Sequence, residues 1–427
     1  MNGNNSAVLI DTASQINSAD SGTVGISLDG QYTGAVPSGF TSGVEGENRG
    51  TISLTGNNSA GLYRANGVRF LNNGSITAGN DSIGIRTSGA GSLIVNNGTI
   101  QTGSGSQGMY GEESSSLENK GNILSSGAKT TGIYGESTGA MTISNTGTIN
   151  LLGDDSIGIY AKGTGTKTIT NIGTVETGSS SDISKPGVGI YSDNSSDVIT
   201  NTGTVKAGTG SAGIYGKGST IIQQGVIETG DSGTGIYTDG GTVTLFAGST
   251  LTTGSNNGVG VYGINGALII NDGMTSIGDG SFGYGLKSGA NLINNTALTL
   301  GDNAVGVYGD GAGSITAGSA ADILMTGSNN IGYYTINGGN IQNDAAITGT
   351  AGTGNVGIYN LGGSINNTGN ISVGDSVIID KTDSTKNIYA VGIYGDRAVV
   401  NNTGDISVGY YGVGIYSKDA PAVTENN

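Results

Sequence analysis

The chain lacks several residue types on which common protein functions depend. Its 427 residues include no cysteine, no histidine and no tryptophan, and only 3 prolines. The absence of cysteine excludes disulfides, thiolate metal sites and cysteine nucleophiles. The absence of histidine excludes a serine–histidine–aspartate triad, and no Gly-rich stretch continues into the Lys-Ser/Thr of a phosphate-binding loop. We therefore expect no catalytic residues, no metal site and no cofactor.

Positive charge is also scarce. Lysine and arginine total 16 against 32 aspartates and glutamates, which gives a net charge of −16. This excess repels nucleic acid and anionic lipid. No segment approaches the roughly 18 apolar residues of a transmembrane helix, and residues 1–5 lack the charged and apolar regions of a signal peptide. The sequence predicts no nucleic-acid partner and no membrane insertion by this segment.

Glycine is abundant, with 84 residues, while only 34% of the chain is hydrophobic. Such a composition is compatible with disorder and cannot build a thick core. However, a Gly-Ile-Tyr signature returns every 21 to 35 residues, with its tyrosine at positions 63, 110, 134, 160, 191, 215, 237, 262, 308, 334, 359, 394 and 416. Degenerate copies are Gly25-Ile26-Ser27, Gly84-Ile85-Arg86 and Gly285-Leu286-Lys287. A repeat of this length predicts stacked units that share one core.

The segment from Ile143 to Ala161 shows the expected structure of one unit. Alternate residues from Ile143 to Leu151 are mainly apolar and predict a strand with one buried face. The turn residues 153–156 follow, and Ile157 and Ile159 are then expected to point inward while Tyr160 points outward. Short strands joined by Gly-rich corners predict a parallel β-helix.

A second motif, Asn-x-Gly-x-Ile/Val, recurs at asparagines 48, 72, 96, 119, 145, 171, 201, 367 and 402. Each Asn shares a face with inward aliphatic residues, so successive coils would stack the amides about 4.8 Å apart. Amides at that spacing can hydrogen-bond into a ladder. The glycine two residues later is expected at a corner where a Cβ would clash. We interpret the motif as structural.

The signature tyrosines are expected to form an exposed aromatic stripe. One interpretation is that like rings stack and stabilise the sheet, with about 0.2–1 kcal/mol per pair. The other is a ridge that binds carbohydrate or protein, because aromatic residues are enriched where surfaces recognise partners. Under this second interpretation, the candidate binding residues are Tyr110, Tyr134, Tyr160, Tyr191, Tyr215, Tyr237 and Tyr262.

Acidic residues recur in the turns before the signature, at Asp81, Asp155, Asp231, Asp279 and Asp302. Stacked carboxylates could collect calcium. However, asparagine or threonine fills comparable turns elsewhere, and the chain does not match the Gly-Gly-x-Gly-x-Asp calcium repeat. A turn-forming role is the favoured interpretation.

Three intervals exceed the usual period and are predicted to be inserted loops, at 28–47, 178–187 and 375–388. Loops that project from a solenoid often carry function. The third mixes apolar residues with Lys381 and Lys386, which we take as further candidate binding residues. A tolerated surface insertion is the alternative interpretation for all three.

The combination of Asn-x-Gly-x-Ile with Gly-Ile-Tyr-Gly in an acidic, cysteine-free chain resembles the passenger repeats of type V autotransporters. It is most similar to the large fusobacterial outer-membrane adhesins. The resemblance covers about residues 22–416. It implies a right-handed parallel β-helix on the cell surface, carried through the outer membrane by a C-terminal β-barrel that this segment lacks.

We therefore predict an all-β, right-handed parallel β-helix of about sixteen coils, with residues 1–427 as one segment of a longer passenger. The expected function is a non-catalytic adhesin or stalk at the cell surface, whose partner is a protein or glycan of a host or bacterial surface. The alternative is a β-helix enzyme acting on surface polysaccharide, which would need carboxylates converging with a basic or acidic partner. Ice binding through Thr146/Thr148 and Thr202/Thr204 needs a regular threonine grid, and the unequal coil lengths argue against it.

Overall fold

The computed structural model describes residues 2–4, 7–29, 38–41, 44–65, 69–113, 115–180, 187–419 and 425–426. The described chain is an all-β parallel β-solenoid of about 15 turns with essentially no helix, consistent with right-handed winding. The predicted fold class is confirmed, and the predicted count of about sixteen coils is close. The chain forms two compact units, residues 1–220 and 221–427. Each is described by itself below.

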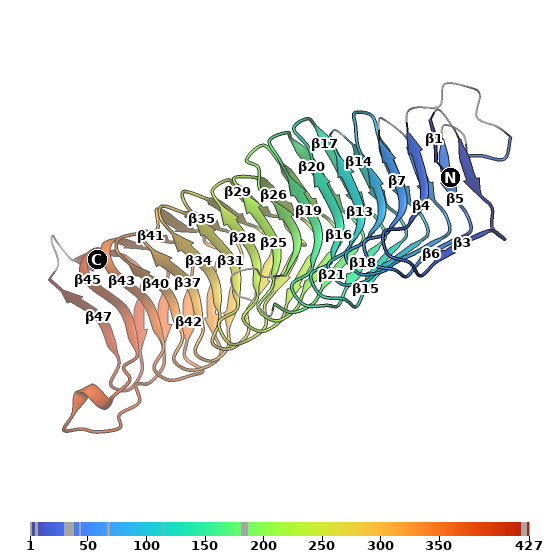
Figure 1. Cartoon of the computed structure of the whole chain (residues 1–427). Coiled ribbons are helices and arrows are strands. Elements are labelled where there is room, and N and C mark those ends of the chain that lie inside the picture. The colour runs from blue at the N-terminus through green and yellow to red at the C-terminus, as the bar shows by residue number, and fades with distance from the viewer. Residues whose placement is uncertain are drawn as a thin grey trace. The chain divides into compact units, whose positions relative to one another are not determined.

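Each coil of unit 1 (residues 1–220) contributes three strands, which stack in parallel on those of the next coil (Figure 1). The first row contains β1 (Asn2–Asn4), β4 (Val24–Asp29), β7 (Ala60–Ala65), β10 (Ile83–Thr87), β13 (Gln107–Glu112), β16 (Thr131–Glu136), β19 (Ile157–Lys162), β22 (Val188–Ser192) and β25 (Ala212–Lys217). The second contains β2 (Val8–Ile10), β5 (Gly46–Asn48), β8 (Arg69–Asn72), β11 (Leu93–Asn96), β14 (Ser116–Asn119), β17 (Met141–Asn145), β20 (Lys167–Asn171) and β23 (Val198–Asn201). The third contains β3 (Gln15–Ser18), β6 (Thr51–Leu54), β9 (Ser75–Ala78), β12 (Thr99–Thr102), β15 (Asn122–Ser125), β18 (Thr148–Leu151), β21 (Thr174–Thr177) and β24 (Thr204–Ala207).

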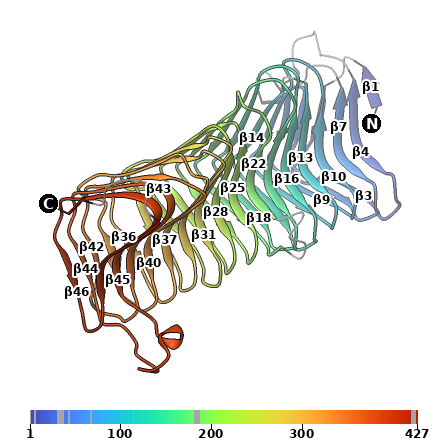
Figure 2. The same ribbon diagram turned by 90° about the vertical axis from the view of Figure 1, so that its left-hand side faces the viewer.

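Unit 2 (residues 221–427) repeats this plan (Figure 2). Strand β26 (Thr220–Gln223) includes the boundary residue. The first row contains β28 (Thr234–Asp239), β31 (Val259–Ile264), β34 (Phe282–Lys287), β37 (Val305–Asp310), β40 (Ile331–Ile336) and β47 (Val413–Lys418). The second contains β29 (Thr242–Leu245), β32 (Leu268–Asn271), β35 (Asn291–Asn294), β38 (Ser314–Ala317), β41 (Asn340–Asn343) and β48 (Glu425–Asn426), while β43 (Val356–Asn367) and β45 (Val391–Asn402) run through both rows. The third contains β27 (Val226–Thr229), β30 (Thr250–Thr252), β33 (Met274–Ser276), β36 (Leu298–Leu300), β39 (Ile323–Met325), β42 (Ile347–Gly349), β44 (Ile371–Val373) and β46 (Ile406–Val408); a short 3₁₀ helix spans Ser384–Lys386.

The core of each coil is one layer of inward aliphatic side chains. In the coil that contains β16 to β18, Ile133, Ile143 and Ile149 are fully buried, as the period-two pattern predicts. One expectation is wrong. Ile159 is buried, but Ile157 is only partly buried and does not belong to the core. Gly158 occupies an inward position between them and breaks the alternation.

The signature glycine is required by close packing between coils. A Cβ built on Gly132 would lie 2.6 Å from the carbonyl oxygen of Gly158 and 2.6 Å from Ile149 Cγ2. Gly108 meets Gly132 and Ile123 in the same way. Glycines of the Asn-x-Gly motif are equally constrained, since a Cβ at Gly147 would overlap the carbonyl oxygen of Gly121. The role predicted for the Asn-x-Gly glycine is confirmed, and the signature glycine is needed for close approach between coils.

The predicted asparagine ladder is present and buried. In unit 1, the Nδ2 of each Asn donates to the Oδ1 of the next over 2.7–2.8 Å, through Asn48, Asn72, Asn96, Asn119, Asn145, Asn171 and Asn201. In unit 2, Asn367 donates to Asn402 over 2.6 Å. The same column holds pairs that the motif does not identify, Asn271–Asn294 and Asn343–Asn367, each at 2.7 Å. The ladder satisfies polar groups that burial would otherwise make costly.

Strand pairing corrects one alignment of the repeat. Gly285-Leu286-Lys287 is not the signature copy, because Tyr284 pairs with Val261 and Gly285 pairs with Tyr262. The copy is therefore Gly283-Tyr284-Gly285, and Gly285 rather than Lys287 interrupts the tyrosines. Tyr284 is fully buried, and its hydroxyl lies 3.1 Å from Thr275 Oγ1.

Candidate functional site

The signature tyrosines of unit 1 form a stacked column on the outward side of the first-row strands. Tyr110, Tyr134, Tyr160, Tyr191 and Tyr215 pair in register from one coil to the next. Their ring centroids are separated by 4.7–5.0 Å. The predicted in-register stripe is confirmed here; the rings meet edge-to-face or tilted, except for Tyr191 and Tyr215, which stack face to face. The rings are half-buried against one another rather than freely exposed.

Carboxylates on the same strands hold some of these hydroxyls. The Tyr134 hydroxyl donates to Glu136 Oε2 over 2.9 Å, and the Tyr110 hydroxyl donates to Glu112. Burial, followed by the hydrogen bond to Glu136, raises the pKa of Tyr134 above its usual value. These phenols therefore stay protonated at neutral pH and can act as hydrogen-bond donors.

Arg86 occupies the position between Tyr63 and Tyr110 in the unit 1 column. Its Cζ lies 5.5 Å from the Tyr63 ring centroid and 5.0 Å from that of Tyr110. Its Nη2 is also 3.0 Å from Glu112 Oε1. The planar guanidinium thus takes the place of a ring and gains a carboxylate partner.

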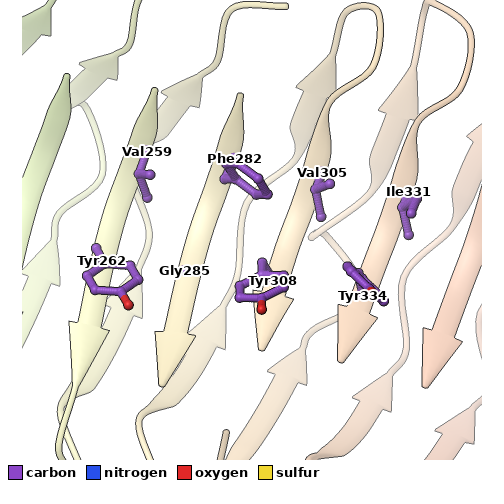
Figure 3. A pocket seen from close by; sticks show the side chains of 8 residues that line it. All are labelled: Val259, Tyr262, Phe282, Gly285, Val305, Tyr308, Ile331 and Tyr334. Atoms are coloured by element: carbon purple, nitrogen blue, oxygen red, sulfur yellow. The ribbon is translucent and has the colours of Figure 1, made fainter. Parts of the chain in front are cut away.

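The unit 2 column runs through Tyr237, Tyr262, Gly285, Tyr308, Tyr334, Tyr359, Tyr394 and Tyr416. Of the site residues predicted from the sequence, it therefore includes Tyr237 and Tyr262. Beside it lies a parallel apolar row of Val259, Phe282, Val305 and Ile331, and the two rows border a groove of about 490 Å³ at Gly285 (Figure 3). The lining of this groove is almost entirely carbon. The sequence does not predict this groove, because only strand pairing shows that Gly285 is the residue that aligns with the tyrosines.

The third predicted loop, 375–388, lies entirely within the described residues and carries Lys381 and Lys386. Val377 and Ile388 form an antiparallel bridge at its base. Lys386 Nζ lies 3.1 Å from Asp380 Oδ2 and 3.4 Å from Asp383 Oδ2, while Lys381 is exposed. Hydrogen bonds from Thr382, then from Lys386, lower the pKa of Asp380 to about 2. This segment lies apart in sequence from the predicted tyrosine residues, and their predicted binding roles stay predictions.

The other two predicted loops are only partly described. Residues 30–37 and 42–43 of the first, and 181–186 of the second, lie outside the described residues. In the first, Glu47 is buried and accepts hydrogen bonds from Arg49 Nε at 2.6 Å and from the Thr41 backbone N–H at 2.9 Å. Arg49 also donates to the Gly39 carbonyl over 2.7 Å. Residues 39–41 are thereby attached to the coil.

Carboxylates in the turns accept hydrogen bonds from backbone N–H groups of the next coil. Asp279 Oδ1 accepts from the Asp302 backbone N–H, and Asp302 Oδ1 accepts from that of Ser328, at 2.9 and 2.8 Å. Asp279 lies in a turn and Asp302 in a bend, in agreement with the turn-forming interpretation. Within the described ranges, no group of three or more acidic side chains is arranged to hold a metal ion.

A carboxylate flanked by two cations lies at the end of unit 2, and it is the kind of group from which an enzyme site could be built. Asp396 lies 3.2 Å from Arg397 Nε and 3.8 Å from Lys418 Nζ. Arg397 also borders a pocket of about 270 Å³ with Leu361 and Asn337. The group also includes Asp419, whose Oδ2 lies 3.9 Å from Lys418 Nζ, so it has two cations and two carboxylates, the number of carboxylates that glycoside hydrolysis uses.

Comparison with known proteins identifies one similarity. Residues 233–427, less than half of the chain, match the family model described as the BigA third pectate lyase-like domain. Neither the curated proteins nor the solved structures gave a match. In the described part of the chain, no helix has the length and apolar character needed to cross a bilayer. The match and the observed solenoid together fit a surface-type, passenger-like β-helix.

Proposed function

We propose that the chain is a segment of a bacterial surface adhesin or stalk, displayed as an autotransporter passenger similar to those of fusobacterial adhesins. In this role it would be a non-catalytic scaffold that binds a protein or glycan of a host or bacterial surface. The observation that carries the proposal is the combination of buried Asn and Gly columns with an outward column of aromatic rings. The first gives rigidity without disulfides, and the second offers a repeated recognition surface.

The test is binding of the purified full chain to host cells, bacterial cells and a glycan array. One variant replaces residues 375–388 by a short Gly-Ser linker, and a second carries Tyr134→Ser, Tyr160→Ser and Tyr191→Ser. As a matched control, Thr→Ser changes at Thr142, Thr168 and Thr200 alter the second-row strands β17, β20 and β23 of the same three coils. We expect one of the first two variants to lose binding and the control to keep it. Binding that survives in both would contradict these site residues and leave only a spacer role.

A second candidate is an enzyme acting on surface polysaccharide. It is favoured by the description of the matched family as pectate lyase-like, and by the group formed by Asp396, Arg397 and Lys418. Incubation with acidic and neutral polysaccharides, followed by chromatography of the products, tests it directly. If chains are cleaved and Arg397→Ala abolishes the cleavage, the non-catalytic assignment is wrong.

A further inference from the structure

The tyrosine column of unit 2 has a vacant position at Gly285. Where the column is continuous, as from Tyr334 to Tyr359 and from Tyr394 to Tyr416, neighbouring ring centroids lie 5.0 and 5.1 Å apart. Next to Gly285 the ring of Tyr262 leans over the glycine, so that a Cβ there would clash with it. Phe282 lies to one side, 5.9 Å from the Tyr308 ring centroid (Figure 3). The groove at this position is bordered by the rings of Tyr262, Tyr308 and Phe282.

The chain itself shows which group fits such a position. Between Tyr63 and Tyr110 it is filled by the Arg86 guanidinium, at 5.5 and 5.0 Å from the two ring centroids. The carboxylate that pairs with Arg86 belongs to Glu112, two residues after the tyrosine of the next coil. Arginine suits the position because its planar, weakly hydrated faces stack on rings while its edges donate hydrogen bonds.

The surroundings of Gly285 reproduce this arrangement without the arginine. Tyr308 corresponds to Tyr110. Asp310, two residues after Tyr308, corresponds to Glu112, two residues after Tyr110. The Asp310 carboxylate has two existing partners: Asn337 Nδ2 donates to its Oδ1 over 2.7 Å, and Lys287 Nζ, on a side chain that is 52% exposed, lies 3.7 Å from its Oδ2. Exposed pairs of this kind contribute little, so an incoming guanidinium can share or replace Lys287.

We propose that the position over Gly285 binds an arginine side chain of a partner protein, with the guanidinium between Tyr262 and Tyr308 and its edge toward Asp310. This inference rests on the proposed binding role of the scaffold and names the chemistry of one partner residue. A neutral sugar is a poorer fit, because it carries no charge to pair with the Asp310 carboxylate. Lysine is a poorer fit as well, because its compact ammonium is strongly hydrated and cannot stack as a plane.

Titration of the full chain with short capped peptides, followed by NMR of the peptide, tests the proposal. Gly-Arg-Gly is compared with its lysine, citrulline and phenylalanine counterparts; citrulline keeps the planar shape of arginine but loses the charge. We expect upfield shifts of the arginine δ-protons from the ring currents, and binding of the lysine and citrulline peptides at least about fivefold weaker. Equal or tighter binding of the phenylalanine peptide would overturn the proposal in favour of an aromatic ligand.

Variants of both columns make the test specific to this position. Gly285→Tyr would displace the Tyr262 ring, with which its Cβ would clash, and fill the groove, so it should abolish arginine binding, while Asp310→Asn should weaken it and Lys287→Ala should strengthen it. Arg86→Gly should create a second site between Tyr63 and Tyr110 that binds the same peptide. If Gly285→Tyr does not fold, Asp310→Asn and Arg86→Gly still decide the matter. Arginine binding that is insensitive to all of these changes would show that the position is not the site.

The peptide titration also separates this inference from the proposed adhesive function. Suppose that the parent chain binds the arginine peptide, that Gly285→Tyr does not, and that the parent chain does not bind cells. This result would support the arginine site and contradict the adhesive role. Cell binding in the parent with no arginine binding would do the reverse. Neither result depends on knowing the partner.

Discussion

At the scale of single residues, the buried asparagines are the clearest link between sequence and stability. Asn96 accepts a hydrogen bond from Asn72 over 2.7 Å and donates to Asn119 over 2.8 Å. Asn97, the next residue, belongs to a second Asn–Asn contact, with Asn73 at 2.8 Å, but is exposed. Water can replace the bonds of Asn97 and cannot reach those of Asn96.

We expect Asn96→Ala to destabilise the protein by about 2–5 kcal/mol, because it removes the shorter hydrogen bond of the buried Asn72 amide and leaves the buried Asn119 oxygen without its donor. Asn97→Ala is the matched control and should change the free energy of unfolding by less than about 0.5 kcal/mol. Urea unfolding followed by circular dichroism measures both. Equal changes in the free energy of unfolding for the two variants would mean that burial does not determine how much these hydrogen bonds stabilise the protein.

The inward positions can be tested at the place where alternation fails. Ile159→Lys puts a charge into a fully buried position and should cost several kcal/mol or prevent folding. Ile157→Lys, two residues earlier on the same strand β19, places the same charge on a partly buried outward position and should be tolerated. Thermal unfolding of the two variants decides the question. If Ile159→Lys melts like the parent, the assignment of Ile159 to the core is wrong.

At the scale of strands and loops, the repeat predicts what depends on periodicity alone. The strands β16 to β18, the asparagine ladder and the register of Tyr110 with Tyr134 follow from spacing, because each coil must match its neighbours. The vacancy at Gly285 could not be predicted in this way. Gly283-Tyr284-Gly285 and Gly285-Leu286-Lys287 both fit a degraded signature, and only strand pairing shows which one stacks on Val261 and Tyr262.

Local backbone form is the other limit on prediction from the sequence. Strict alternation predicts that Ile157 points inward, but Gly158 interrupts the alternation by placing its own backbone toward the core. Tyr333 is fully buried although the adjacent Tyr334 belongs to the outward column. Residue type does not separate these two tyrosines. The two tyrosines differ in the side of the strand on which each side chain lies.

The attachment of the first predicted loop should depend on pH. Burial opposes ionisation of Glu47, but hydrogen bonds from Arg49 and Thr41 outweigh it and lower the pKa of Glu47 below its ordinary value of 4.5. A folded-state pKa below the unfolded value means that the contribution is present above pH 4.5 and is lost as the pH falls through the folded-state pKa.

We therefore expect the melting temperature to fall as the pH is lowered from 5 to 3, and Glu47→Gln to remove part of this dependence. Glu118→Gln is the control, since Glu118 forms an exposed pair with Lys120 at 2.8 Å. Melting curves at each pH provide the measurement. A Glu47→Gln profile parallel to that of the parent would contradict the role given to this carboxylate.

At the scale of the whole molecule, stacked coils imply that stability is close to a sum of coil and interface terms. Deleting residues 131–156 removes one complete coil, β16 to β18. The register shows that Tyr110 would then face Tyr160 and Asn119 would face Asn171, each in the same column. Glu112, which now pairs with Glu136 in the register, would face Lys162 instead.

We expect the deletion variant to fold with the mean residue ellipticity of the parent and to unfold cooperatively. The reason is that, in the shortened protein, tyrosine still lies next to tyrosine and asparagine next to asparagine. The matched control deletes residues 131–145 and so removes β16 and β17 but keeps β18. That change places a third-row strand where a first-row strand belongs and should abolish native β-structure. Circular dichroism and limited proteolysis of the two proteins distinguish the cases. If both deletions fold equally well, the three strand rows do not define the unit of stability, and additivity between coils fails.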